Sequence, residues 1–504
     1  MAADVIIRKQ KIKVTTVNET VALHLRKHLN GSLQYNLIAM LEEVFSKYDV
    51  ANVYINIDKL KVNIGEVSLD DFEKNFFQIA SPYLAGAVQK HLQQNEQLFK
   101  EFEKHQQANS GTDATHPLTL NGGKQQQINA LFHFLKSGVY PWWHKDQNHT
   151  PSQILQTLNE GENETLLLKI FETRKNNHAG ELNNIIERLF IHLPSARHEA
   201  TINRLLNLLN DSSLSNNIRV LLKNADQLTR LFSFTQTEFN KKLFTFLIAG
   251  TTADHRNAIF DFINILKKDT NISDIALASK SAPINVTDEL KQILETLVTE
   301  ERCNNKEVTS PEPQEDPLSL NNKNKTQIKK PSSSSDEEQG FYINNSGLVL
   351  LHPFLQSLFQ ELGVLNEQHQ FVSLAAKYKA AVLLYYLQCG EQEYKEWQML
   401  LNKILCNIPV DDVIPGGILI TPGEVAECNT LLQTIVNYWE ALKGSSPQAV
   451  QQTFILREGK ISFKEDHWML QVERTGTDIL LDRLPWGFST IRFPWLPNII
   501  YTEW

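Results

Sequence analysis

One segment with very few apolar residues limits how this chain can fold. Residues 303–340 read CNNKEVTSPEPQEDPLSLNNKNKTQIKKPSSSSDEEQG, a mixture of proline, serine, asparagine and charged side chains. Such a segment cannot bury enough apolar surface to offset the conformational entropy that it would lose on ordering. We therefore predict a disordered linker over residues 303–340 and place the main domain boundary of the chain there.

The composition outside this segment is that of a globular protein. The chain has 504 residues, of which 41% are hydrophobic and 21% are charged, so it can form more than one core. The formal net charge of −9 argues against a surface built to bind nucleic acid. We expect no nucleic-acid partner.

The cysteines and the apolar patterning indicate where the chain resides. The four cysteines are scattered and none is in a CxxC pair, which favours a reducing compartment over a disulfide framework. The N-terminal sequence has no signal-like apolar segment, and no run of 18 apolar residues occurs. We therefore expect a cytoplasmic protein with no membrane partner.

Residues 1–110 are predicted to form an N-terminal α+β unit. Apolar residues alternate over 5–14, 53–57 and 60–64, and a turn at Asp58-Lys59 would pair the last two segments in a hairpin. Between the strands, residues 33–44 carry helical spacing. Ser68 and Asp71 form a helix-capping pattern before another apolar helix face.

Residues 125–302 are predicted to be a helical domain. Segments rich in leucine and isoleucine are separated by short polar breaks such as NHTPS, EGEN, NNHAG and NDSSLSNN. This spacing indicates helical hairpins, and a solenoid-like stack is an open alternative because the sequence shows no fixed period.

Residues 341–504 are predicted to be a C-terminal helical domain that ends in short strands. A buried helix is expected over FYINNSGLVLLHPFLQSLFQELGVL, and Thr421, Pro422 and Glu424 form a capping box for a later helix. GKISFKED and HWMLQVER alternate like a hairpin, and FSTIRF and NIIYTEW can add strands. The predicted fold class is α+β, predominantly helical.

The aromatic C-terminal tail allows two interpretations. It is either packed onto the C-terminal helices or exposed as a plug for a partner. A free plug would expose a large apolar patch, which soluble proteins avoid. We therefore predict that Trp486 and Phe493 are buried, and we take Trp495 and Trp504 as the candidate partner-contact residues.

No local motif for chemistry stands out. His24 and His28 have the spacing of zinc ligands on a helix, but Leu25 replaces the expected glutamate and no third ligand is near. Asp411 and Asp412 are interpreted as a solvated turn or a helix-end charge, and the cysteines as core residues. We predict no catalytic, cofactor-binding or metal-binding residues, no cofactor, and no enzymatic activity.

Several segments together resemble a known family. IIRKQKIKV, VYINIDKLKVNIGEV, FLKSGVYPWW at 134–143, GLVLLHPFLQSLFQELG at 347–363 and the ending TDILLDRLPWGFSTIRFPWLPNIIYTEW look like the contractile injection system tape measure proteins. The resemblance implies a part in phage-tail-like particles, in which a contractile sheath surrounds a rigid tube on a baseplate, and a link to tube length. It also implies tube, baseplate or cap components as partners, and carriage in the assembled particle as an alternative to a purely cytoplasmic location.

Two mechanisms are compatible with that family name. A single extended helix rises about 1.5 Å per residue and would reach roughly 750 Å, whereas a compact globule of this length has a radius of gyration of about 23 Å. The strands, prolines and aromatic clusters favour compact domains. The first hypothesis is therefore a non-enzymatic assembly or structural protein. The alternatives are a helical scaffold or chaperone-like adaptor and, less favoured, an enzyme without a local motif.

Overall fold

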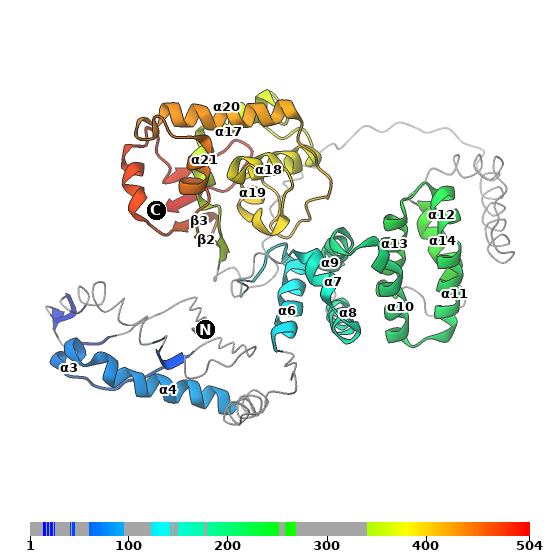
Figure 1. Cartoon of the computed structure of the whole chain (residues 1–504), viewed down its shortest axis with the longest axis horizontal. Coiled ribbons are helices and arrows are strands. Elements are labelled where there is room, and N and C mark those ends of the chain that lie inside the picture. Colours follow the sequence, from blue (N-terminus) through cyan, green and yellow to red (C-terminus); the bar gives the residue numbers. More distant parts are fainter. Residues whose placement is uncertain are drawn as a thin grey trace, which may run out of the picture. The chain divides into compact units, whose positions relative to one another are not determined.

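The structure is a computed structural model of the chain (Figure 1). Contacts between residues divide the chain into two compact units, residues 1–129 and 130–504. The residues that the structure describes are 60–94, 122–141, 144, 150–175, 179–250, 258–268 and 340–504, with scattered positions between 14 and 45. The predicted linker lies outside these residues except for Gly340, so the predicted domain boundary stays a prediction.

The first unit contains a capped helix followed by a longer one. Helix α3 (Leu69–Lys74) begins after Ser68, whose hydroxyl accepts a hydrogen bond from the Asp71 amide, as the capping pattern predicts. Helix α4 (Phe76–Gln94) follows, and both contribute to an apolar cluster that also receives side chains from 60–64. No strand is formed over 60–67, and the segments predicted to pair with it lie outside the described residues.

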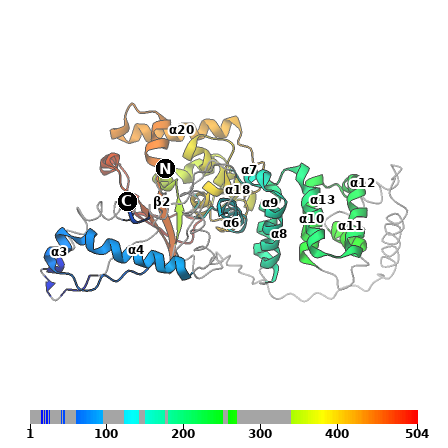
Figure 2. The ribbon, with the colours of Figure 1, turned by 60° about the horizontal axis from the view of Figure 1, so that its bottom comes forward.

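Residues 130–268, called the helical region below, form a series of helices. Helix α6 (Gly122–Ser137) begins in the first unit, and its last turns lie in the helical region. They are α7 (Pro151–Thr157), α8 (Glu160–Lys175), α9 (Ala179–His192), α10 (His198–Leu209), α11 (Ser212–Lys223), α12 (Ala225–Phe232), α13 (Gln236–Ala249) and α14 (Ala258–Lys268). Helix α10 packs on α8, α11 and α13, and α13 also packs on α9, so these helices lie side by side (Figure 2).

Three of the predicted polar breaks, NHTPS, EGEN and NDSSLSNN, contain helix starts. Thr150 and Thr235 each form a capping box, and Asp211 caps α11 through a hydrogen bond from the Leu214 amide. The EGEN segment, predicted as a break, is the first turn of α8, where Glu160 and Glu162 lie near the positive end of the helix dipole.

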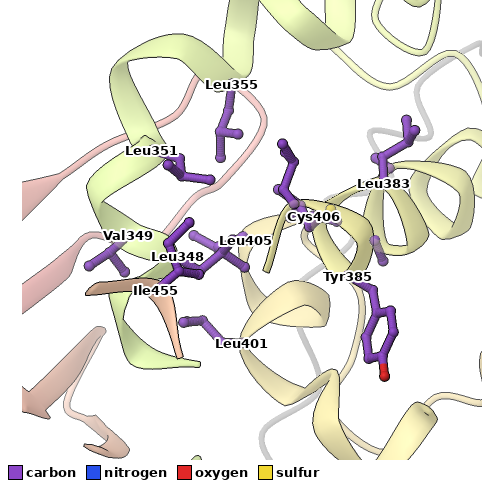
Figure 3. Close-up of a cluster of buried hydrophobic side chains, with 14 of the residues drawn as sticks. Leu348, Val349, Leu351, Leu355, Leu383, Tyr385, Leu401, Leu405, Cys406 and Ile455 are labelled. Carbon is purple, nitrogen blue, oxygen red and sulfur yellow. The ribbon is translucent and has the colours of Figure 1, made fainter. Parts of the chain in front are cut away.

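Residues 340–504, called the C-terminal region below, contain short helices around a large apolar core (Figure 3). Their α-helices are α17 (His352–Glu361), α18 (Leu374–Cys389), α19 (Leu400–Leu405), α20 (Pro422–Tyr438) and α21 (Pro447–Val450), which continues as a π-helical turn, Gln451–Ile455. The predicted capping box at α20 is confirmed. Among the described residues, no helix combines the length and the apolar character needed to span a membrane.

A five-stranded sheet completes this region, with the order β1-β2-β3-β5-β4. Its strands are β1 (Phe341–Ile343), β2 (Gly459–Lys464), β3 (His467–Val472), β4 (Thr490–Ile491) and β5 (Ile500–Glu503). The predicted β2–β3 hairpin is confirmed, and both tail segments add strands, β5 running parallel to β3. The fold is therefore α+β and predominantly helical.

The start of the C-terminal region differs from its predicted helix. Residues Phe341–Ile343 form the edge strand β1, paired antiparallel with β2, and Ser346–Leu351 form a 3-10 helix before α17. The apolar run does not form one continuous α-helix because it changes partners, from the sheet to the core. At Gly347 an added Cβ would overlap the Phe454 carbonyl oxygen.

We predict that Gly347→Ala destabilises the C-terminal region, because the backbone of the π-helical turn leaves no room for a methyl group. The expected loss is about 2 to 3 kcal/mol or more of unfolding free energy, measured by urea titration. Gly476→Ala is the matched control, since an added Cβ there meets nothing within 4 Å, and it should change stability by less than about 0.5 kcal/mol. Equal effects of the two variants would contradict the packing at Gly347.

Candidate functional site, a buried ion cluster joining two regions

Three charged side chains from distant parts of the sequence meet in the interior. Arg188 on α9 is fully buried, and its Nε donates to both carboxylate oxygens of Glu396, at 3.1 and 3.2 Å. Arg188 Nη2 donates to Glu396 Oε1 at 3.0 Å, and Lys403 Nζ donates to the same oxygen at 2.7 Å. Glu396 lies just before α19 and Lys403 within it. This ion cluster, Arg188, Glu396 and Lys403, joins the helical region to the C-terminal region.

The remaining donors of Arg188 are satisfied by main-chain oxygens. Nη1 donates to the carbonyls of Leu135 and Lys136, at 3.0 and 3.1 Å, which lie at the C-terminal end of α6. The last carbonyls of a helix lack partners within the helix and carry the negative end of its dipole, so a guanidinium is a suitable partner. Nη2 also donates to the carbonyls of Asp411 and Asp412, at 2.8 and 3.0 Å.

The Asp411-Asp412 loop thus contributes backbone atoms rather than carboxylates. Lys403 Nζ donates to the Asp412 carbonyl at 2.7 Å, and Asn184 on α9 donates to the Asp411 carbonyl at 2.9 Å. The Asp411 side chain is exposed, as the turn interpretation predicts. The Asp412 side chain is half-buried and accepts a hydrogen bond from Tyr378 at 3.0 Å.

Gly138 leaves the space that the cluster occupies. Its φ is +77°, a conformation that favours glycine, and an added Cβ would lie 2.7 Å from Arg188 Nη2 and 3.0 Å from Glu396 Oε1 and Lys403 Nζ. Gly138 belongs to the FLKSGVYPWW segment, one of the segments that resemble the family. The packing of the ion cluster therefore explains why position 138 is a glycine, which the sequence alone does not reveal.

The cluster contains two cations and one anion. Burial raises the pKa of Glu396, but Lys403 and Arg188 together lower it by more. The net shift of that pKa is downward, and the carboxylate is ionised. Burial lowers the pKa of Lys403 more than Glu396 raises it. The main-chain carbonyls supply the negative potential that a single carboxylate cannot, which is the condition for keeping paired charges in an interior.

An aromatic group lies beside the ion cluster. The rings of Phe134, Tyr140 and His192 lie 5.9, 6.0 and 6.1 Å, between centroids, from the ring of Trp397, which follows Glu396 in sequence. Burial lowers the pKa of His192 to about 4; Arg188 lowers it as well, while Glu396 opposes the shift. His192 is therefore neutral at pH 7, and its Nδ1 lies 3.5 Å from Ser152 Oγ.

The structure places the predicted partner-contact residues within or against the apolar core. Trp495 is 3% exposed, stacks on Phe493 at 4.7 Å, and donates from Nε1 to the Leu405 carbonyl at 2.8 Å. Asn407 donates to the Trp495 carbonyl at 2.9 Å, so the tail is held at the end of α19. Phe493 is buried as predicted, whereas Trp486 is only half-buried.

Trp504 is half-buried and contacts a second buried ion pair, Arg457 and Asp478. Its Nε1 donates to Asp478 Oδ2 at 3.0 Å, and the Arg457 guanidinium lies 5.4 Å from its ring centroid. Arg457 donates to both Asp478 oxygens, at 2.6 and 2.9 Å. Burial raises the pKa of Asp478, but the hydrogen bonds from Arg457, the Thr475 amide and Trp504 outweigh it and hold this pKa at about 2. The partner-contact role of both tryptophans stays a prediction.

The residues considered for chemistry give no reactive arrangement in the described part of the chain. Cys406 and Cys428 are buried, and burial raises the pKa of both thiols, that of Cys428 to about 12. No group of three or more histidine, cysteine or acidic side chains is placed to hold a metal ion among the described residues. His24, His28 and Cys303 lie outside them.

Sequence reasoning missed the ion cluster because Arg188 lies 208 residues before Glu396 in the chain. Two local signals existed. Arg188 follows the apolar residues of NNIIERLFIH and lies on the buried side of an amphipathic helix. Glu396 and Lys403 are seven residues apart in EWQMLLNK, a spacing that places two side chains on one face of a helix.

We predict that Trp495→Ala lowers the unfolding free energy by about 3 to 5 kcal/mol, because it removes a buried ring and a hydrogen bond. Trp495→Phe, which keeps most of the apolar area, should lose about 1 kcal/mol. Tyr438→Ala, at a side chain that is 66% exposed, is the control and should be nearly neutral. If Trp495→Ala keeps full stability, the ring is available to a partner and the packing described above is wrong.

We also predict a pH dependence from His192. The unfolded side chain gains a proton below its ordinary pKa of 6.5, whereas the folded one stays neutral down to about pH 4. Stability is therefore complete above pH 6.5 and falls as the pH drops toward 4, by about 2 kcal/mol between pH 7 and pH 5. Urea titrations at both pH values should show this loss reduced in His192→Gln relative to the wild type. An unchanged loss in the variant would exclude His192 as its source.

Comparison with known proteins complements this geometry. The model of one family, the contractile injection system tape measure proteins, matches residues 4–504. No curated protein and no solved structure matches the chain. The matched range contains the FLKSG segment, the ion cluster and the whole aromatic tail. The chain therefore belongs to the contractile injection system tape measure protein family.

Proposed function

We propose that this protein is a folded, non-enzymatic assembly factor of a contractile injection system, and that it affects tube or sheath assembly without acting as an extended helical ruler. Membership of the family supports a structural, tape-measure-like role in such a system. The observation that carries the more specific proposal is the ion cluster, which can exist only while the end of α6, α9 and residues 396–412 are folded together.

The helix lengths support the same proposal. The longest helix among the described residues, α4, has 19 residues and spans about 28 Å at about 1.5 Å per residue. To act as one extended ruler, the C-terminal region would have to lose its apolar core. The helical region and the C-terminal region would also have to separate, which would leave Arg188, Glu396 and Lys403 without their partners. Losing one partner of a buried ion pair alone costs about 3 to 5 kcal/mol.

The proposed partners are other components of the particle, namely tube, baseplate or cap proteins. The proposed site of action is the cytoplasm during assembly, and the protein can remain in the finished particle. A compact factor acts through surfaces, so its effect depends on its fold and not on the number of residues in the chain.

Changing the length of the chain tests this proposal in a producing strain. A helical insert of about 40 residues within 303–340 would add about 60 Å to a ruler. We predict that particles assembled with this variant keep the wild-type distribution of tube lengths in negative-stain images, whereas deleting the gene alters or abolishes the tubes.

Two strains complete the experiment. Complementing the deletion with the wild-type gene must restore the particles, and a glycine–serine insert of equal length separates the effect of helicity from that of chain length. Tubes that lengthen by tens of ångströms with the helical insert would establish a ruler. Normal particles after deletion of the gene would exclude an assembly role.

A further inference from the structure

The C-terminal region and the helical region have separate apolar cores. The large cluster of buried apolar residues in the C-terminal region extends from Leu348 to Ile500. Within the part of the chain that the structure describes, Val139 is its one member from before residue 340, and the buried residues of α7–α14 do not belong to it. Each region therefore keeps most of its hydrophobic stabilisation whether or not it contacts the other.

The contacts between the two regions are mainly polar and aromatic. They include the ion cluster with its carbonyl partners, the hydrogen bond from Asn184 to the Asp411 carbonyl, and the rings of Phe134, Tyr140 and His192 against Trp397. Val139 adds an apolar contact with the core of the C-terminal region. Below, this set of contacts is called the junction. Its three charged members are as deeply buried as a core residue, with exposures of 0% for Arg188, 1% for Lys403 and 5% for Glu396.

Charged and apolar contacts respond differently to separation in water. A buried ion pair has already lost its hydration, so opening it returns hydration energy that offsets much of the lost attraction. An apolar core gains nothing comparable on exposure. The junction is therefore expected to open at a lower free energy than either core, and as a unit, because one guanidinium makes most of the polar contacts between the two regions.

We propose that the ion cluster is a conformational latch: the helical region and the C-terminal region can separate as folded bodies, and Arg188, Glu396 and Lys403 set the equilibrium between the closed and the open state. Opening would remove Arg188 from the carbonyls of Asp411 and Asp412, which precede the loop at 413–421. That loop contains Leu419, which is 82% exposed. This inference rests on contacts within the chain and does not depend on the proposed function.

Hydrogen–deuterium exchange of the full chain tests the latch. The junction segments are 138–141 and 406–412, which lie outside the helices, so their amides can exchange when the regions separate with their helices intact. The reference segments are the β2–β3 hairpin and α10–α13. In Glu396→Gln, two buried cations lose their anion, so exchange in the junction segments should rise about a hundredfold. Exchange in the reference segments should stay unchanged, which also shows that the variant is folded.

Four further variants make the result specific. Lys395→Ala removes only an exposed partner of Glu391 and should leave all exchange rates at wild-type values. Gly138→Ala should raise junction exchange, whereas Gly363→Ala, at a similar φ but with nothing within 4 Å of the added Cβ, should not. The combined Arg188→Met, Glu396→Leu and Lys403→Met variant should restore protection, because an apolar junction replaces the ionic one.

Two results would overturn the proposal. If exchange in the β2–β3 hairpin rises as much as in the junction, the two regions unfold as one cooperative core and no separable latch exists. If junction exchange in Glu396→Gln equals that of the wild type, the ion cluster does not control the contact between the regions.

Discussion

A buried guanidinium needs hydrogen-bond acceptors around its whole edge. This requirement determines how the helical region and the C-terminal region contact each other. Arg188 obtains its acceptors from the end of α6, from Glu396 and from the Asp411-Asp412 loop. No one of these segments can satisfy it alone, and an unpaired charge in the interior would cost several kcal/mol. The position of α9 relative to α19 is therefore fixed by electrostatics and hydrogen bonding as much as by apolar packing.

Local features of the fold were predictable where the responsible residues are neighbours in sequence. The Thr421 capping box, the Ser68 cap and the β2–β3 hairpin each depend on a few consecutive residues, and all were predicted correctly. The edge strand β1 was missed because its strand character comes from pairing with β2, more than a hundred residues later. The apolar pattern of residues 341–351 is compatible with a strand or a helix until that partner is known.

The ion cluster could not be predicted for a related reason. Local spacing can place Arg188 on the apolar side of its helix, but only the three-dimensional meeting of α6, α9 and α19 shows which partners its charge has. The carbonyls that complete the site belong to backbone that any residue could supply, so they leave no mark in the sequence. Gly138 is the exception, since only a residue without a Cβ fits beside Arg188.

Apolar burial combined with specific hydrogen bonds also explains why the aromatic tail is ordered. Three tryptophans of this tail pack against the core and also donate from the indole nitrogen to specific acceptors: Trp486 to the Leu350 carbonyl, Trp495 to the Leu405 carbonyl and Trp504 to Asp478. Tryptophan combines a large apolar area with one directed donor, so each ring is fixed in orientation as well as buried. Leucine would supply only the apolar contact and would leave those acceptors without a donor. The tail is thus attached at three separate points of the C-terminal region, and this accounts for its order despite the proline bends between the rings.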